Sequence, residues 1–416
     1  MTTSESDRRE RSALPTVEGC RRDPGRLKLQ AVTRNGVYAT AGRTVYCETT
    51  PFEFERVGSI PVPDEGLRGL VQRLQTARPW KPALEAVVGS YQTVNLWAVS
   101  DWDDGDGTLL ATVGSDVFRS TDGGRTWSQT LELHSSSPRM GTLPTSLCSC
   151  GGTTYLAEYP LSESTTPRVF LSTNGGRTWE PFLTADVRHF HSVAVDPHDG
   201  ALWLTTGDRD SECRILRVGK DLLDEVEAGE RDRIDANDVQ TVGGGSQRWR
   251  AVELAFTPAA IVWGMDCAYV EENELLALPR SEVNAADPTP QRIGAVNASV
   301  YYAGTVAVDG DEWVVLSTAA EAGGDRTAPP GMGSTADRYA TVVAAPADDL
   351  TDWRRLLTYT RHRSVADRIP LSDALPTANA YVLLASAPER GLLVNPVNTV
   401  TDDGRIRAVS PAVFSR

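Results

Sequence analysis

The chain has 416 residues, of which 40% are hydrophobic and 23% charged, so it can bury the core of one large domain or two ordinary ones. Its net charge of −15 argues against a nucleic-acid partner held through phosphates, and no apolar run approaches the roughly 18 residues that a membrane helix needs. Only three of its 41 basic residues are lysines, and because an acidic, lysine-poor composition is typical of proteins adapted to molar salt, we expect a halophilic source.

The first segment in chain order, residues 1–25, is polar and without hydrophobic periodicity, which predicts a disordered tail. It contains no apolar stretch of the kind that directs secretion, so we expect a cytoplasmic protein. Over residues 26–416, short β-branched and aromatic runs alternate with turn-forming residues, which is typical of an all-β domain. One short helical insertion is predicted near 64–78, where four apolar residues recur at helical spacing behind Asp64 as a cap.

A ten-residue segment occurs twice, 52 residues apart. Residues 118–127 read FRSTDGGRTW and residues 170–179 read FLSTNGGRTW, while 345–353 is a degenerate third copy that keeps an acidic turn and a final tryptophan. Side chains that bond a tight turn, paired glycines that permit positive φ, and a tryptophan that folds back as an apolar plug predict a hairpin with a structural role. The residues expected to form it are Ser120, Asp122, Gly124 and Trp127 in the first copy and Ser172, Asn174, Gly176 and Trp179 in the second.

This repeat resembles the Asp-box (BNR) repeat of the sialidase-like β-propellers. The resemblance implies one all-β domain folded as a β-propeller, in which each blade has four strands and about 40–50 residues. We predict seven blades, although six or eight stay open because the incomplete first and last units can close one blade together. The predicted blades are 28–63, 93–134, 139–184, 188–230, 247–294, 298–357 and 376–410.

Propeller topology predicts where a site would lie. The first strand of each blade begins, and the second ends, on one face of the ring, while the hairpin between the third and fourth strands lies on the opposite face. Second-strand ends carry a carboxylate in four consecutive blades, and first-strand starts add further polar groups. Strand alternation puts the two histidines of the HFH segment on one side. The residues expected to line this face are Glu158, His189, His191, Asp208, Gln247, Arg250, Asp266, Tyr302 and Glu321.

The middle of the chain is also similar to a subset of uncharacterised Asp-box proteins associated with polysaccharide genes. In that subset an HxH strand, a TTGDxDxE turn, a GSQxWRA strand and a WGxD turn follow one another. Here these elements read HFH, TTGDRDSE, GSQRWRA and WGMD. The resemblance supplies no reaction, but it implies a shared site at His189, His191, Asp208, Gln247, Arg250 and Asp266.

Three functions stay open on these residues. In a glycan-processing hydrolase or lyase, Asp208 and Asp266 would be the acid/base pair, with His191 as an alternative base and Arg250 holding an acidic group. In a metal-centred site, His189, His191 and Asp208 would bind a divalent ion such as Mn, Zn or Ca, which could neutralise a uronate carboxylate. In a non-catalytic propeller, the same face would bind a protein partner. We favour recognition of a glycan at this face, with cleavage of that glycan as a further step.

Two observations weigh against these functional interpretations. In so acidic a chain, turn chemistry or salt adaptation also explains a carboxylate at a strand end, and core hydrogen bonding explains a histidine pair. A true sialidase is not expected, because the Arg-Ile-Pro motif that precedes the repeats in those enzymes occurs here only at 368–370, after them. No tyrosine nucleophile with a partner acid is evident either.

Overall fold

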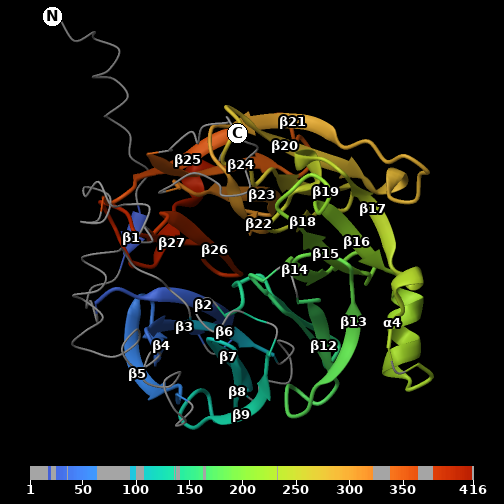
Figure 1. Ribbon diagram of the computed structural model, residues 1–416. Coiled ribbons are helices and arrows are strands. Elements are labelled where there is room, and N and C mark those ends of the chain that lie inside the picture. Colours follow the sequence, from blue (N-terminus) through green and yellow to red (C-terminus); the bar gives the residue numbers. More distant parts are fainter. Residues whose placement is uncertain are drawn as a thin grey trace, which may run out of the picture.

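The protein is a seven-bladed β-propeller. The computed structural model describes residues 17–19, 25–34, 36–62, 94–99, 107–134, 136, 141–162, 165–231, 233–321, 338–363 and 378–414. In these residues, 28 strands form seven four-stranded antiparallel sheets arranged in a ring (Figure 1). This architecture confirms the predicted fold class and blade number. The helix expected near 64–78 lies outside the described residues.

In blades 1 to 6 the strands follow the chain from the inside of the ring to the outside (Figure 1). Blade 1 comprises β2 (Lys28–Thr33), β3 (Gly36–Ala41), β4 (Thr44–Thr50) and β5 (Glu53–Ser59). Blade 2 comprises β6 (Val94–Ala98), β7 (Leu109–Val113), β8 (Asp116–Ser120) and β9 (Ser128–Glu132). Blade 3 comprises β10 (Leu147–Cys150), β11 (Thr153–Ala157), β12 (Arg168–Ser172) and β13 (Glu180–Thr184). Blade 4 comprises β14 (Phe190–Val195), β15 (Leu202–Thr206), β16 (Arg214–Val218) and β17 (Gln240–Gly244). Blade 5 comprises β18 (Ala255–Phe256), β19 (Ala260–Gly264), β20 (Asn273–Pro279) and β21 (Gln291–Val296). Blade 6 comprises β22 (Val300–Val308), β23 (Asp311–Thr318), β24 (Tyr339–Pro346) and β25 (Arg354–Thr360).

The seventh blade combines three strands from the C-terminal part of the sequence with one from the N-terminal part. Strands β26 (Tyr381–Ala387), β27 (Gly391–Val397) and β28 (Arg407–Val409) are completed by β1 (Val17–Gly19), which pairs antiparallel with β28. The predicted first unit, 28–63, forms a complete blade of its own, and the last unit is completed by β1, which lies outside every predicted blade. Strand β1 lies within the segment expected to be a tail. A three-residue strand held by main-chain hydrogen bonds leaves no hydrophobic period in the sequence, and the rest of 1–24 lies outside the described residues.

Blade 4 departs from the predicted boundaries. Its third and fourth strands are joined by helix α4 (Lys220–Glu227) in place of a tight hairpin, so β17 lies beyond the predicted end of the blade at residue 230. Short 3-10 helices follow at η1 (Ala236–Asp238), η2 (Gln247–Trp249), η3 (Arg280–Glu282) and η6 (Pro411–Val413). Among the described residues, no helix has the length and apolar character of a membrane-crossing segment.

Apolar side chains pack mainly between neighbouring blades. One cluster joins residues of blades 3 and 4, including Tyr155, Phe182 and Leu204, all of which are buried. Each blade is a single sheet with two faces, so each face must be covered by the next blade around the ring. A ring of such contacts makes the inner strands rigid, and the polar site described below is built on their ends.

The two repeats form hairpins between the third and fourth strands of blades 2 and 3. In the first, the Ser120 hydroxyl accepts a hydrogen bond from the Gly124 amide (2.9 Å), and the Asp122 carboxylate accepts from the amides of Arg125 (3.0 Å) and Thr126 (2.9 Å). In the second, the Ser172 hydroxyl accepts a hydrogen bond from the Gly176 amide (2.9 Å), and the Asn174 Oδ1 accepts from the amides of Arg177 (3.1 Å) and Thr178 (3.0 Å). All four paired glycines have positive φ. These turns are closed by their own side chains.

The hairpin tryptophans are half-buried, and each packs against a hydrophobic cluster. The Trp127 Nε1 donates to the carbonyl oxygen of Gly124 within its own turn (3.0 Å). The Trp179 Nε1 instead reaches Thr130 of the preceding blade (3.3 Å). A Cβ added at Gly176 would lie 2.4 Å from the side chain of Leu110, so the second hairpin packs directly on blade 2. The rings therefore seal the edge between blades and are not enclosed in a core.

Candidate functional site

Asp208 is held at the end of β15 by a turn that requires glycine. Gly207 has φ of +90°, and a Cβ there would lie 2.2 Å from the carbonyl carbon of Glu212. The Thr206 hydroxyl donates to the carbonyl oxygen of Glu212 (2.8 Å), and the Glu212 carboxylate accepts from the amide of Arg209 (3.3 Å). The TTGDRDSE segment thus folds back on itself and fixes the backbone that carries Asp208.

Arg250 follows a turn and not the strand that the GSQRWRA segment predicts. Two aromatic rings fold η2 against blade 5, because the indole of Trp249 stacks on Trp263 with ring centroids 5.5 Å apart. The Trp263 Nε1 donates to the carbonyl oxygen of Arg248 (2.8 Å), and the Asp266 amide donates to that of Arg250 (3.0 Å). Aromatic packing and main-chain bonds override the strand pattern here and bring Arg250 beside Asp266.

Two histidines at the start of β14 face one another. The Nδ1 of His189 lies 3.2 Å from the carbonyl oxygen of Pro160, and the Nδ1 of His191 lies 3.0 Å from that of Ala251. Since a carbonyl only accepts, both Nδ1 atoms carry hydrogen. The two Nε2 atoms lie 3.1 Å apart, on the same side of the segment, as strand alternation predicts. Burial lowers the pKa of His189, which disfavours its charged form.

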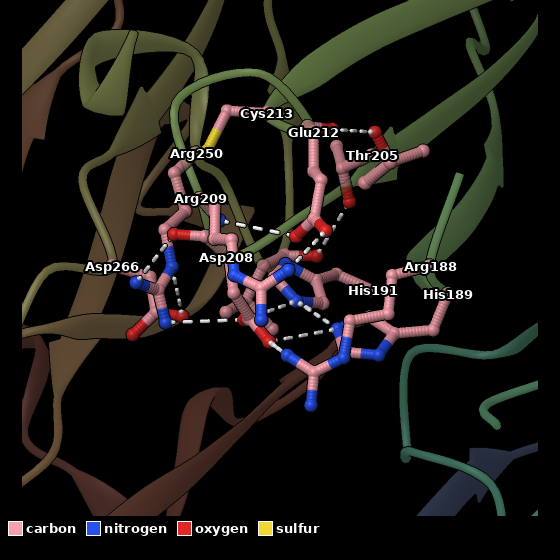
Figure 2. A network of polar contacts seen from close by, with 12 residues as sticks. Arg188, His189, His191, Thr205, Asp208, Arg209, Glu212, Cys213, Arg250 and Asp266 are labelled. Atoms are coloured by element: carbon pink, nitrogen blue, oxygen red, sulfur yellow. Dashed lines mark hydrogen bonds and ion pairs between the residues drawn. The ribbon is translucent and has the colours of Figure 1, made fainter. Parts of the chain in front are cut away.

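The Asp208 carboxylate is the centre of the cluster (Figure 2). Its oxygens lie 3.4 Å from the Nε2 of His189 and 3.4 Å from the Nε2 of His191. The Nη1 of Arg188 forms an ion pair with the same carboxylate, and the Nη2 of Arg250 lies 3.2 Å from it. Burial disfavours the charged form of Asp208, but its ion pairs with the two guanidiniums stabilise that form. This carboxylate is therefore ionised.

Arg250 joins the two predicted acid/base residues. Its Nε lies 3.3 Å from the Asp266 carboxylate, while its Nη1 donates to the main-chain oxygen of Asp208 (3.1 Å) and contacts the Gln247 amide oxygen (3.4 Å). The Gln247 Nε2 donates to the same main-chain oxygen (3.0 Å). Gln247 therefore positions the turn that carries Asp208, and a single guanidinium lies between the two aspartates.

The cluster is nearly enclosed and opens at Arg188 and Asp208. The side chains of His189 and His191 are 1% and 3% exposed, whereas those of Asp208 and Arg188 are 13% and 17% exposed. The ring of Tyr159 covers His189 with centroids 4.3 Å apart. Within the described part of the chain, His189, His191 and Asp208 are the group whose ligand atoms converge as a metal site requires, all within 4.8 Å of one another.

Three other predicted residues lie apart from this cluster. The Glu158 carboxylate is fully buried and forms a two-pronged pair with Arg168 at 3.0 Å for each contact, which explains its strand-end position by local pairing. Tyr302 is buried in an apolar cluster and its ring packs 6.4 Å from that of Tyr301. Glu321 is half-buried and contributes, after burial, to the raised pKa of Tyr301.

Two members of the cluster were not predicted. Arg188 directly precedes the HFH segment, and Tyr159 follows Glu158, so both are sequence neighbours of residues that were singled out. Their position next to predicted site residues was the signal by which the sequence could have indicated them. Strand alternation would have turned Arg188 away from Asp208, but it lies in a bend before β14 begins, where alternation does not apply.

Comparisons with known proteins find structural similarity without a sequence relative. No protein family matches the sequence, and no curated protein matches it. The chain is similar to an ancestral GH74 enzyme with 14% identity and a TM-score of 0.44, covering 82% of this chain and 39% of the enzyme. It is also similar to an oligogalacturonate lyase in complex with manganese, with 8% identity and a TM-score of 0.40, covering 76% of this chain and 77% of the lyase. A chain of a mitotic checkpoint complex has 11% identity and a TM-score of 0.48, covering 98% of this chain and 96% of that one. Membership of the Asp-box family stays a prediction.

Proposed function

We propose that this propeller binds an acidic glycan over the polar cluster. The observation that carries the proposal is Arg188, which lies at the opening of the cluster. Its Nη1 pairs with Asp208, and its side chain keeps 17% exposure at this opening. The carboxylate of a uronic acid matches the planar fork of a guanidinium. A ligand carboxylate at the opening would pair with the part of this guanidinium that reaches the surface.

The electrostatics favour elimination over hydrolysis as a cleavage reaction. Hydrolysis by paired carboxyl groups needs one of them protonated, and the contacts of Arg250 with both Asp208 and Asp266 favour the charged form of each. Elimination needs a neutralised uronate and a base that removes the proton beside its carboxylate. Arg188, at the opening, would pair with the uronate carboxylate, and His191, when its Nε2 is free, is the base within the cluster. The glycosidic C–O bond at the β-position then breaks and a C=C bond forms, while the leaving oxygen takes a proton from water.

The test compares acidic and neutral oligosaccharides of equal length by calorimetry. We expect galacturonate oligomers to bind and glucose oligomers not to bind. Arg188→Met keeps the apolar stem but removes the charge, and should weaken binding at least about tenfold, as loss of a charge-assisted pair does. Arg209→Met is the matched control, because Arg209 is half-exposed on the same turn and pairs with Glu212. Equal binding of both sugars, or full binding by Arg188→Met, would contradict the proposal.

A non-catalytic, protein-binding propeller is the second candidate. The observation that favours it is the internal pairing of Arg250 with Asp208 and Asp266, which also suits a purely structural core. In that case neither oligosaccharide binds, no unsaturated product accumulates, and a protein partner captured by the wild type is captured equally by Arg188→Met. Binding without product would instead indicate a glycan-binding protein without turnover.

A further inference from the structure

The histidine pair presents an unresolved electrostatic problem. Because both Nδ1 hydrogens are directed at main-chain oxygens, both Nε2 atoms present lone pairs, and these atoms lie only 3.1 Å apart. Two lone pairs repel one another at this separation. The repulsion disappears when a proton or a metal cation lies between the two nitrogens.

The distances in the triad match those around a small metal ion. An ion with bonds of about 2.0–2.2 Å to nitrogen and oxygen separates neighbouring ligand atoms by roughly 3.0–3.5 Å. Here the Nε2 atoms are 3.1 Å apart and each lies 3.4 Å from an Asp208 oxygen. We propose that His189, His191 and Asp208 together bind one divalent transition-metal ion. This inference goes beyond glycan binding and does not rest on it.

The surroundings of the triad are those of a metal site. Bound histidines usually donate their second N–H to a carbonyl or carboxylate, which fixes ring orientation, and bound carboxylates are themselves hydrogen-bonded. Pro160 and Ala251 supply the carbonyl oxygens, and Arg188 and Arg250 hold the carboxylate. Two imidazoles with one carboxylate suit manganese, iron, cobalt or zinc. Calcium, which prefers oxygen ligands, suits this donor set less well than the sequence analysis supposed.

The charge of the site indicates what else the ion would take. Arg188 and Arg250 balance Asp208 and Asp266, so a divalent ion leaves two uncompensated positive charges in a nearly enclosed site. An anionic ligand at the remaining coordination positions relieves this excess. A uronate carboxylate is such a ligand, and this last step alone rests on the proposed function. His191 bound to metal is not available as a base, so the loaded protein would need another group in that role.

Cobalt titration of the full-length, chelator-treated protein tests the site. We expect one Co²⁺ per chain by calorimetry, with visible absorption bands of Co²⁺ in nitrogen and oxygen ligands. His191→Gln should weaken binding by more than the roughly 10–100-fold loss that removal of an outer-shell partner causes. His198→Gln is the matched control, because His198 is an exposed histidine that lies outside the triad. Its Co²⁺ affinity should equal that of the wild type.

The result has two clear alternatives. Absence of stoichiometric Co²⁺ binding by the folded wild type overturns the proposal without any variant, and so does unchanged binding by His191→Gln. If His191→Gln does not fold by circular dichroism, Asp208→Asn replaces it with the same expectation. Glycan binding is measured separately on metal-free and Co²⁺-loaded protein. Failure of the glycan proposal therefore appears as absent sugar binding, and failure of the metal proposal as absent Co²⁺ binding.

Discussion

The hairpins of blades 2 and 3 and the polar cluster lie on opposite faces of the ring and are built in opposite ways. In the hairpins, Asp122 and Asn174 bond to amides three or four residues along the chain. In the cluster, Asp208 is bound by Arg188, 20 residues away, and by Arg250, 42 residues away. A local bond forms wherever its segment folds. The cluster exists only after blades 4 and 5 have assembled.

This difference indicates what each region contributes. The hairpins are partly exposed, so their polar bonds carry a small desolvation cost and stabilise the turns directly. The cluster encloses charged groups, whose desolvation offsets most of their mutual attraction, and apolar residues would stabilise such a position equally well. We infer that the hairpins serve the fold and the cluster serves binding. The following predictions test that division, from the largest expected effect to the smallest.

Removal of Asp208 should have the largest effect on stability. Asp208→Ala leaves the buried charges of Arg188 and Arg250 without their shared partner, and loss of one member of a buried ion pair costs about 3–5 kcal/mol. Urea unfolding in the presence of a chelator measures this cost. Asp210→Ala is the control, since its exposed carboxylate accepts one bond from Gln247 and its loss should cost less than about 1 kcal/mol. Equal costs for the two variants would mean that the cluster is not a coupled unit.

Gly207→Ala should destabilise the protein by about 3 kcal/mol, because it adds a steric clash to an unfavourable backbone conformation. The new Cβ would meet the main chain of Glu212. Gly245 also has positive φ, at +83°, but nothing lies within 4 Å of a Cβ there, so Gly245→Ala should cost about 1 kcal/mol. Denaturant midpoints of the two variants separate the clash from the backbone strain. A smaller loss in Gly207→Ala than in Gly245→Ala would contradict the geometry described for the Asp208 turn.

The hairpin tryptophans should contribute to stability alone. Because both rings are half-buried, Trp127→Ala and Trp179→Ala should each cost about 2 kcal/mol, below the 3–5 kcal/mol typical of a fully enclosed ring. Thermal unfolding gives the cost, and calorimetry with galacturonate oligomers and Co²⁺ gives the function. Weakened ligand binding in folded Trp179→Ala would contradict the inference that the hairpins serve the fold and the cluster serves binding.

Acid should distinguish the two hairpins. The side-chain hydrogen bond from Thr126, followed by backbone bonds, lowers the pKa of Asp122 to about 2, below its value in the unfolded chain. Asp122 therefore stabilises the fold above about pH 4, and this contribution is lost as the pH falls towards 2. The second hairpin has Asn174 at the same position and does not titrate there. Asp122→Asn should remove part of the stability loss between pH 4 and 2, and an unchanged pH profile would count against the hairpin bonds.

The fold was predictable because its signals are local. Turn residues between short strand-like runs, and a repeat ten residues long, require no knowledge of distant contacts. Seven blades followed from the spacing of these signals. The fourth strand of blade 4 was misplaced because α4 replaces a turn of a few residues with a longer excursion. Strand β1 was missed because its pairing partner lies at the other end of the chain.

The site was predictable only in part. Topology brought together the HFH pair, Asp208, Arg250 and Asp266, because strand ends on one face must meet near the centre of the ring. It could not show that Glu158 forms an ion pair with Arg168 of its own blade, because a carboxylate at a strand end can either form a local ion pair or line a shared site. Nor could it give the tautomers of the histidines. These depend on two main-chain oxygens whose positions are set by loops from blades 3 and 5.

Strand β1 has a consequence for the order in which the molecule forms. Val17 pairs with Val409, so blade 7 cannot be completed until synthesis has passed residue 409. Blades 1 to 6 can assemble during synthesis, whereas residues 17–19 must wait for the strand with which they pair. Hydrogen exchange at 407–409 in a variant that lacks residues 1–19 would report the open blade. Closure of the ring is therefore a late event in the formation of this molecule.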